Sequence, residues 1–191
     1  MTYQDTLDRL SEDTQRRVLK VLAAYLAGDL VDLEFEALLV AVILTAQDRG
    51  AALADLSLSA QVSAGTGQAA ASQGRRNPNT AQQVRQAVKT TMERARNSED
   101  LEMRLVRMAD NEPRYVARDT YERSLRASSR IEGWTRGLDS DPCELCVWWW
   151  RGGRVWPKDY PLQHHKGCNC TQVPVMTKYQ PEVPHSRILS R

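Results

Sequence analysis

All four cysteines of this 191-residue chain lie in one short stretch, close to two of its three histidines. The stretch begins as Cys143-Glu-Leu-Cys146 and, after eighteen residues, continues as His165-Lys-Gly-Cys168-Asn-Cys170. Thiolate and imidazole groups are the ligands from which proteins build tetrahedral zinc sites, and a Cys-x-x-Cys turn commonly supplies half of one. The spacing therefore predicts a Zn²⁺ site whose candidate ligands are Cys143, Cys146, His165, Cys168 and Cys170.

These five candidate ligands compete for four positions in a tetrahedral site. We expect the Cys-x-x-Cys pair to bind the metal together with His165 and Cys170. Cys168 can take the place of Cys170, and His164 can take the place of His165, so both choices remain open at this stage.

Two other uses of the cysteines are less favoured than metal binding. The polar, acidic N-terminus does not read as a signal peptide, so we expect the chain to be made in a reducing cytoplasm, where disulfides are uncommon. Four unrelated buried thiols would not be expected to gather within 28 residues beside histidines. The longest apolar run, 37–46, is about half the length of a membrane span, so no membrane contact is expected.

The surroundings of the cysteines favour a structural zinc over a catalytic one. A catalytic zinc keeps one position open for water and usually lies beside a carboxylate that transfers protons. Nucleobase deaminases also use Cys-x-x-Cys, but their preceding His-x-Glu element is missing here. The motifs of zinc proteases, phosphate loops, dinucleotide sites and nucleophile elbows are missing as well. We therefore expect no catalytic residue, no small-molecule substrate and no enzymatic activity.

The first third of the chain has the periodicity of two helices. Apolar residues recur at three- and four-residue steps from about 3 to 26 and again from about 30 to 60, with Gly28 between the two segments. This pattern predicts an N-terminal helical hairpin over residues 1–62. Residues 63–80 are short of large apolar groups and rich in Gly, Ser and Asn, which predicts a linker.

Residues 81–132 read as an Arg-rich helical region. Thr80 can cap a helix that continues to about Asn97, and a short helical segment follows over residues 101–109. Pro113 is expected to interrupt it before another amphipathic stretch over residues 115–131. The arginines indicate either a solvated face with internal ion pairs or a surface for an acidic partner.

Residues 133–177 lose helical periodicity and form the predicted Cys/His zinc module. The run from Trp148 to Trp156 suggests two short strands joined by a turn at Gly152 and Gly153. Three consecutive tryptophans on a strand cannot share one face, so at least one is a candidate docking surface. Residues 178–191 are expected to be an extended or disordered tail. The predicted fold class is mainly α with a small α+β C-terminal zinc-binding module, a short hairpin plus a Cys/His knuckle.

Charge is distributed unevenly along the chain. The total of 26 basic and 24 acidic residues gives a net charge of only +2, which argues against a uniformly basic nucleic-acid-binding protein. Residues 1–60 carry a net charge of −5, however, and residues 61–191 carry +7. The two parts therefore offer surfaces of opposite sign.

The C-terminal motifs resemble those of the Mu protein F-like family of tailed-bacteriophage head-morphogenesis proteins. That pattern is Cys-x-x-Cys, a Gly-containing turn followed by a large apolar residue, His-x-x-Cys-x-Cys, and a Thr-x-x-Pro-Val ending. The matching segments here are 141–146, 151–156, 165–170 and 171–175. Lys166 and Asn169 depart from the residues that are frequent in the family, and neither is a proposed ligand.

The resemblance, which covers about residues 130–176, implies a structural minor capsid protein. Such a protein would be made in the host cytoplasm and would lie at the portal vertex or the capsid interior of the virion. Its partners would be the portal protein, the major capsid protein or the scaffold protein, with contact to packaged DNA. The alternatives are a zinc-dependent enzyme (hydrolase, nuclease or capsid-maturation protease) and a DNA-binding zinc module.

Overall fold

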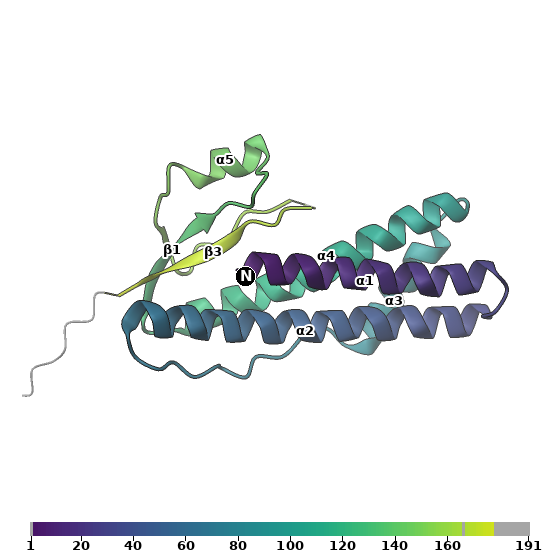
Figure 1. Cartoon of the computed structure of the whole chain (residues 1–191), viewed down its shortest axis with the longest axis horizontal. Helices are drawn as coiled ribbons and strands as arrows, with labels where there is room; N and C mark the ends of the chain where they lie inside the picture. The colour runs from purple at the N-terminus through teal and green to yellow at the C-terminus, as the bar shows by residue number, and fades with distance from the viewer. Residues whose placement is uncertain (1, 166, 178–191) are drawn as a thin grey trace, which may run out of the picture.

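Four long helices lie beside a small antiparallel sheet and a short fifth helix in the computed structural model, which describes residues 2–165 and 167–177 (Figure 1). The elements are, in chain order, α1 (Tyr3–Leu26), α2 (Asp32–Thr66), α3 (Ala81–Glu93), α4 (Ser98–Ala127), β1 (Ile131–Gly137), α5 (Glu144–Trp150), β2 (Trp156–Pro157) and β3 (Thr171–Met176). The predicted mainly helical fold with a small β-containing part is confirmed. The predicted tail, 178–191, lies outside the described residues.

The predicted N-terminal hairpin is present as α1 and α2. Thr2 begins α1 with a capping box, in which its hydroxyl accepts from the Asp5 N–H at 3.1 Å and the Asp5 carboxylate accepts from the Thr2 N–H at 2.7 Å. Gly28 then reverses the chain with a φ of +83°, a conformation that glycine adopts at little cost. The second helix continues to Thr66, beyond the expected end near residue 60.

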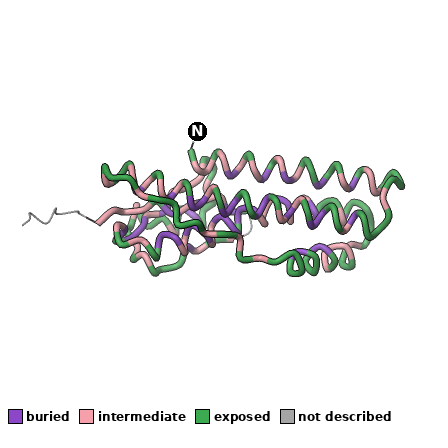
Figure 2. Tube along the Cα trace, turned by 90° about the horizontal axis from the view of Figure 1, so that it is seen from below, coloured by how far each residue is buried: buried purple, intermediate pink, exposed green. Residues whose placement is uncertain are grey.

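The long helix α2 is the centre of the bundle. It packs against α1, α3 and α4, and its buried residues contribute to both large apolar clusters of the core. Figure 2 shows this burial along the inner side of the bundle. Among the described helices, α2 alone is long and apolar enough to cross a membrane, a property that core helices of soluble proteins share.

Pro113 does not interrupt the helical region, contrary to the prediction. It lies inside α4, which is continuous over thirty residues. Proline removes one backbone hydrogen bond from a helix, but it does not end a helix that is held by packing on both sides of it. Here Ala109, Pro113 and Ala117 are all buried. The free energy gained by burying these three side chains explains why the helix continues past Pro113.

The end of α3 also differs from the prediction. This helix ends at Glu93, whereas the sequence suggested about Asn97. Asn97 begins α4, because its side chain accepts a hydrogen bond from the Asp100 N–H at 2.8 Å. An asparagine that can cap a new helix competes with continuation of the preceding one.

The predicted hairpin over residues 148–156 is wrong. The three tryptophans belong to the short helix α5, and β2 consists of two residues only. The sheet order is β2-β1-β3, with both pairs antiparallel, so that β1 is central. Trp156 therefore pairs with Trp134 of β1, far back in the sequence, rather than with the tryptophan run.

The C-terminal part shares its core with the bundle. Ile131, Trp134 and Leu162 are buried in one cluster with side chains of α1, α2 and α4. The predicted linker is also attached, because the buried Asp55 carboxylate accepts from the Gln73 and Arg75 N–H groups at 3.1 and 3.2 Å. The bundle therefore provides a fixed base for the Cys/His segment.

Gly50 allows α2 and α4 to approach closely, and substituting it tests this crossing. A Cβ at Gly50 would lie 2.6 Å from the carbonyl oxygen of Pro113, which is fixed backbone. We expect Gly50→Ala to lower the free energy of unfolding by about 1–3 kcal/mol, although alanine is the better helix former. Urea denaturation followed by circular dichroism measures the change.

Gly65→Ala, in the same helix, is the matched control. A Cβ at Gly65 would meet only the flexible side chain of Met176, at 2.9 Å, which can move. We expect its free energy of unfolding to stay within about 1 kcal/mol of the wild type. Equal losses for the two variants would contradict the close crossing.

Candidate metal centre

The cysteines and His165 gather in one region of the structure, in two groups that share Cys146. His165 Nε2 lies 3.1 Å from Cys143 Sγ and 3.4 Å from Cys146 Sγ, and Cys146 Sγ lies 3.5 Å from Cys168 Sγ. Ligands around a tetrahedral zinc are separated by about 3.6 Å for a nitrogen–sulfur pair and about 3.8 Å for two sulfurs, given the usual bond lengths. These three separations are close to the expected values, so each of the three contacts is compatible with a shared metal ion of this size.

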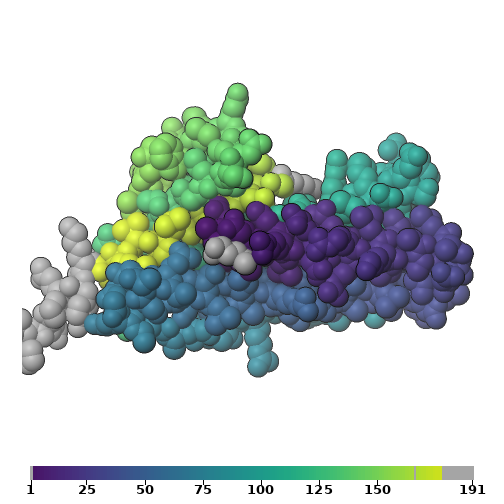
Figure 3. Space-filling model, viewed as in Figure 1, coloured from purple at the N-terminus to yellow at the C-terminus, as the bar shows by residue number. Residues whose placement is uncertain are grey.

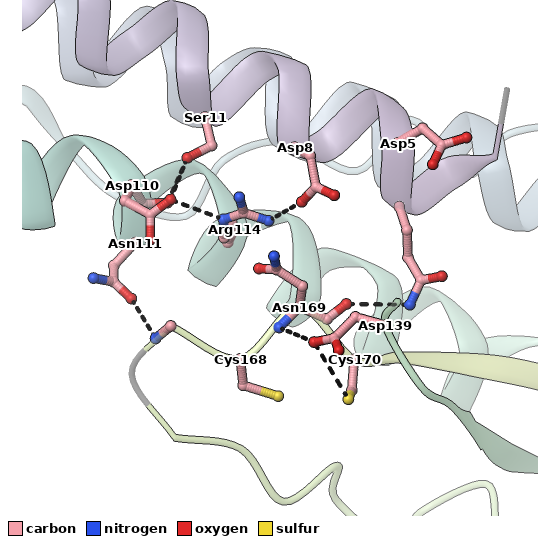
Figure 4. A network of polar contacts seen from close by, with 12 residues as sticks. Asp5, Asp8, Ser11, Asp110, Asn111, Arg114, Asp139, Cys168, Asn169 and Cys170 are labelled. Atoms are coloured by element: carbon pink, nitrogen blue, oxygen red, sulfur yellow. Dashed lines mark hydrogen bonds and ion pairs between the residues drawn. The ribbon is translucent and has the colours of Figure 1, made fainter. Parts of the chain in front are cut away.

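Cys170 belongs to the same cluster. The Sγ atoms of Cys146, Cys168 and Cys170 all lie within 4.8 Å of one another. Cys170 Sγ is also 3.9 Å from Asp139 Oδ2 (Figure 4). Both thiols of the Cys-x-Cys pair face the cluster, as side chains two residues apart do on an extended backbone. Each of the five predicted ligand residues therefore belongs to one or both of two groups, Cys143, Cys146 and His165 or Cys146, Cys168 and Cys170.

His164 is placed differently from His165. Its side chain is exposed, its Nδ1 lies 3.2 Å from the carbonyl oxygen of Leu162, and it belongs to neither candidate ligand group in the described part of the chain. The geometry thus favours His165 as the imidazole ligand.

The cluster is mostly buried, and all four cysteines are free thiols. Cys146, Cys168 and Cys170 are nearly inaccessible, whereas Cys143 is exposed. Leu138 and Trp149 pack against the buried sulfurs. The structure therefore contains a group of thiols shielded from water on one side and reachable on the other.

The short helix α5 positions the first two ligands. Cys143 is its N-cap, and Cys146 lies one turn further on the buried face. Trp149 follows three residues later on that same face, with its ring centroid 6.2 Å from that of His165. Trp148 and Trp150 point outward and are exposed. Helical spacing thus separates the three tryptophans into one that covers the site and two that meet solvent.

A turn held by α4 positions the other ligands. Gly167 has a φ of +78°, and the Cys168 N–H donates to the His165 carbonyl at 3.1 Å. From α4, Asn111 Oδ1 accepts from the Gly167 N–H at 3.3 Å, and Arg118 donates to the Cys168 carbonyl at 3.0 Å. These contacts fix both ends of the turn against the bundle.

The N-terminus of α1 ties the segments around the cluster together. Gln4 Nε2 donates to the carbonyl oxygens of Gly137 and Asn169 at 3.3 and 3.2 Å. Asp139 Oδ2 accepts from the Asn169 N–H at 3.3 Å. Sequence reasoning missed Gln4, Asn111, Arg118 and Asp139, because nothing in their local sequence marks them as neighbours of the cysteines.

The thiols differ in how easily they ionise. The Cys146 backbone N–H lowers the pKa of Cys143 by hydrogen bonding to its sulfur. Burial raises the pKa of Cys146. A hydrogen bond from the Cys170 thiol lowers the pKa of Cys168, and this same bond raises the pKa of Cys170. A bound cation would favour the thiolate form at every ligand position, so binding must release protons.

Comparison of the chain with protein-family models, curated proteins and solved structures finds no match. The fold and the Cys/His cluster must therefore be interpreted from their own geometry. What the cluster supports directly is a capacity to hold a metal ion.

Single substitutions can decide between Cys168 and Cys170 as the fourth ligand. Because Cys168 Sγ is in direct contact with Cys146 Sγ, we predict that Cys168→Ser weakens metal binding by about 10-fold or more. Even the loss of a residue that only hydrogen-bonds to a ligand weakens metal binding by roughly 10–100-fold, so this value is a lower bound. Cys170→Ser should weaken it less. Competition titration with a chromophoric zinc chelator measures both affinities.

The titrations should be repeated at lower pH. Because the ligand thiols must lose protons, we expect the affinity to fall as the pH falls. A larger loss of metal affinity for Cys170→Ser than for Cys168→Ser would identify Cys170 as the fourth ligand, which is the choice that the sequence favours.

Proposed function

We propose that this protein is a structural minor capsid or head-morphogenesis protein of a tailed bacteriophage, whose C-terminal part is held by one Zn²⁺. The observation that carries this proposal is the Cys/His cluster, with its particular order of motifs, docked on a helical bundle. The order is that of the Mu protein F-like family, which the sequence resembles. The docking supports a role for the metal in holding the C-terminal segments against the bundle.

The ligand set supports a structural zinc. The proposed ligands are Cys143, Cys146, His165 and Cys168, of which Cys146 belongs to both candidate groups, so that one bound ion would draw the two groups together. Four protein ligands around one ion would leave no position for a reactive water, so we propose that the protein is not an enzyme.

The proposed partners are the portal protein, the major capsid protein or the scaffold protein. One exposed surface suits such docking, because Trp148 and Trp150 are 56% and 38% exposed on α5. The Arg151 guanidinium lies 3.8 Å from the Trp148 ring centroid, which extends the contact surface. Aromatic and arginine side chains are enriched at the centres of protein interfaces. The proposed location is the portal vertex or the capsid interior, after synthesis in the host cytoplasm.

The metal can be tested on protein purified without chelators from a reducing cytoplasm. We expect one equivalent of zinc by elemental analysis and X-ray absorption showing three sulfur ligands and one nitrogen ligand. Removing the metal should melt the segment around the cluster, because a structural zinc contributes about 10 kcal/mol or more to so small a unit. Hydrogen exchange should show this loss around residues 138–170 and retained protection in α2. Less than half an equivalent of zinc, or a water in the first shell, would contradict a closed site.

The head role can be tested by co-expression with the portal, scaffold and capsid proteins that the proposal predicts to be encoded beside this gene. We expect the tagged chain to co-sediment with procapsids, and Trp148→Ala to reduce its incorporation. Leu19→Ala is a matched control, because it also removes a partly exposed apolar side chain, on α1, away from α5. Absence of the wild-type chain from procapsids would contradict the assembly role while leaving the zinc site untouched.

A further inference from the structure

A large groove lies between α3, α4 and the loop that carries His164 and His165. Its volume is about 840 Å³. Figure 3 shows the molecule hollowed between the Cys/His part and the α3–α4 part. Five arginines line it, namely Arg94, Arg104, Arg107, Arg114 and Arg118. The groove borders the candidate metal site at His165 but does not include the proposed docking surface on α5.

Two of the five arginines are neutralised inside the protein. Arg104 pairs with Asp100 at 3.0 Å, and Arg114 pairs with Asp110 at 3.2 Å and with Asp8. Their charges are therefore largely balanced within the fold.

The other three arginines have no carboxylate partner among the described residues. Arg94 and Arg107 are exposed and make no side-chain ion pair there. Arg118 donates to a backbone carbonyl, that of Cys168. Three arginines without a carboxylate in ion-pair contact in the described part of the chain thus line one concave surface.

The acidic residues of the groove are already engaged by neighbouring helices. Asp110 accepts from Ser11 and Gln15 of α1 in addition to Arg114. Glu112 accepts from Gln47 of α2 at 2.6 Å. The two carboxylates of the lining keep their charges, but the five arginines outnumber them, so the field in the groove is positive.

The arginines of α4 follow one face of the helix. Residues 104, 107, 111, 114 and 118 succeed one another at three- and four-residue steps, which places them on one stripe. The stripe is about 21 Å long at 1.5 Å per residue. It therefore offers a line of cationic and amide donors along the groove rather than a single anion site.

The remaining lining residues indicate what kind of anion fits. Thr90 adds a hydroxyl group, and Tyr115 is 53% exposed. Apart from Tyr115, the apolar residues of the lining are Ala87 and Met108. A groove for a protein segment normally offers buried apolar anchor pockets, which this lining lacks. Guanidinium groups beside an exposed aromatic ring are instead the combination that binds single-stranded nucleic acid.

We propose that this groove binds a single strand of nucleic acid, with Arg94, Arg107 and Arg118 on its phosphates and Tyr115 stacked on a base. The groove has walls formed by α3 and by the loop that carries His164 and His165. A concave groove of this kind follows the backbone of one strand, which favours a single strand over a duplex. The proposal goes beyond the head-assembly role and stands on the groove alone.

Fluorescence anisotropy with labelled oligothymidylate of about 12 nucleotides tests the proposal on the full chain, a length within the usual site sizes of roughly 4–16 nucleotides. We expect the double variant Arg94→Gln/Arg107→Gln to weaken binding at least 10-fold near 100 mM salt. Its log–log salt slope should be less steep by about 1.4, at about 0.7 per lost phosphate contact. Arg118 is not substituted, because it also holds the Cys168 carbonyl.

Arg49→Gln/Arg76→Gln is the matched control. It removes the same charge from two exposed arginines outside the groove. We expect it to retain affinity within about two-fold and to keep the wild-type salt slope within about 0.5. Circular dichroism confirms that both double variants fold.

Tyr115 provides a second test, because an effect of this uncharged side chain on binding cannot be explained by charge alone. Tyr115→Ala should weaken binding about five-fold or more, and Tyr115→Phe should retain it, because stacking needs the ring and not the hydroxyl. Equal losses in the two double variants, or tighter binding of duplex DNA than of the single strand, would overturn the proposal. So would equal affinity for polyglutamate with the same salt slope, which would identify the groove as a site for an acidic protein segment.

Discussion

The long helix α2 has twelve buried residues spread along it from Phe35 to Val62, and the fold must exclude water from all of them. No single neighbour can do this. α1 and α4 cover it along much of its length, α3 covers the half that contains Phe35 and Leu39, and β3 reaches its other end. The contact at Gly50 shows how close the packing is, because the α4 backbone occupies the space of a Cβ there. The bundle is thus organised around the burial of one helix.

That bundle supplies what the Cys/His segment cannot make for itself. The segment has seven residues of helix and a sheet whose outer strand β2 is two residues long, which is too little to bury a core of its own. Its side chains Ile131, Trp134 and Leu162 instead pack into the core of the helical bundle. The candidate metal ligands lie partly on the short helix α5 and partly on the turn that α4 holds. A metal ion would add a crosslink where apolar burial is thinnest.

The arrangement separates three surfaces that could act independently. The cluster is shielded by Trp149, the exposed pair Trp148 and Trp150 faces away from it, and the arginine groove opens between the cluster and α3. His165 lies at the boundary of two of these surfaces, because it belongs to the ligand set and also lines the groove. Metal binding would therefore order one wall of the groove, which links the proposed structural zinc to the surface beside it.

The sequence alone was sufficient for the helical hairpin, the mainly helical class and the five residues of the metal cluster, because helical periodicity and Cys/His spacing are local properties of the chain. Predictions from the sequence were wrong where packing against distant residues outweighed a local conformational preference. Pro113 stays within α4 because Ala109 and Ala117, one turn before and after it, are buried with it, and the tryptophan run is helical because Trp149 covers the cluster. The preference for His165 over His164, the roles of Gln4 and Asn111, and the convergence of the arginines depend on contacts between residues distant in sequence. Only the tertiary structure decided these, because burial and long-range hydrogen bonds leave no periodic trace in the sequence.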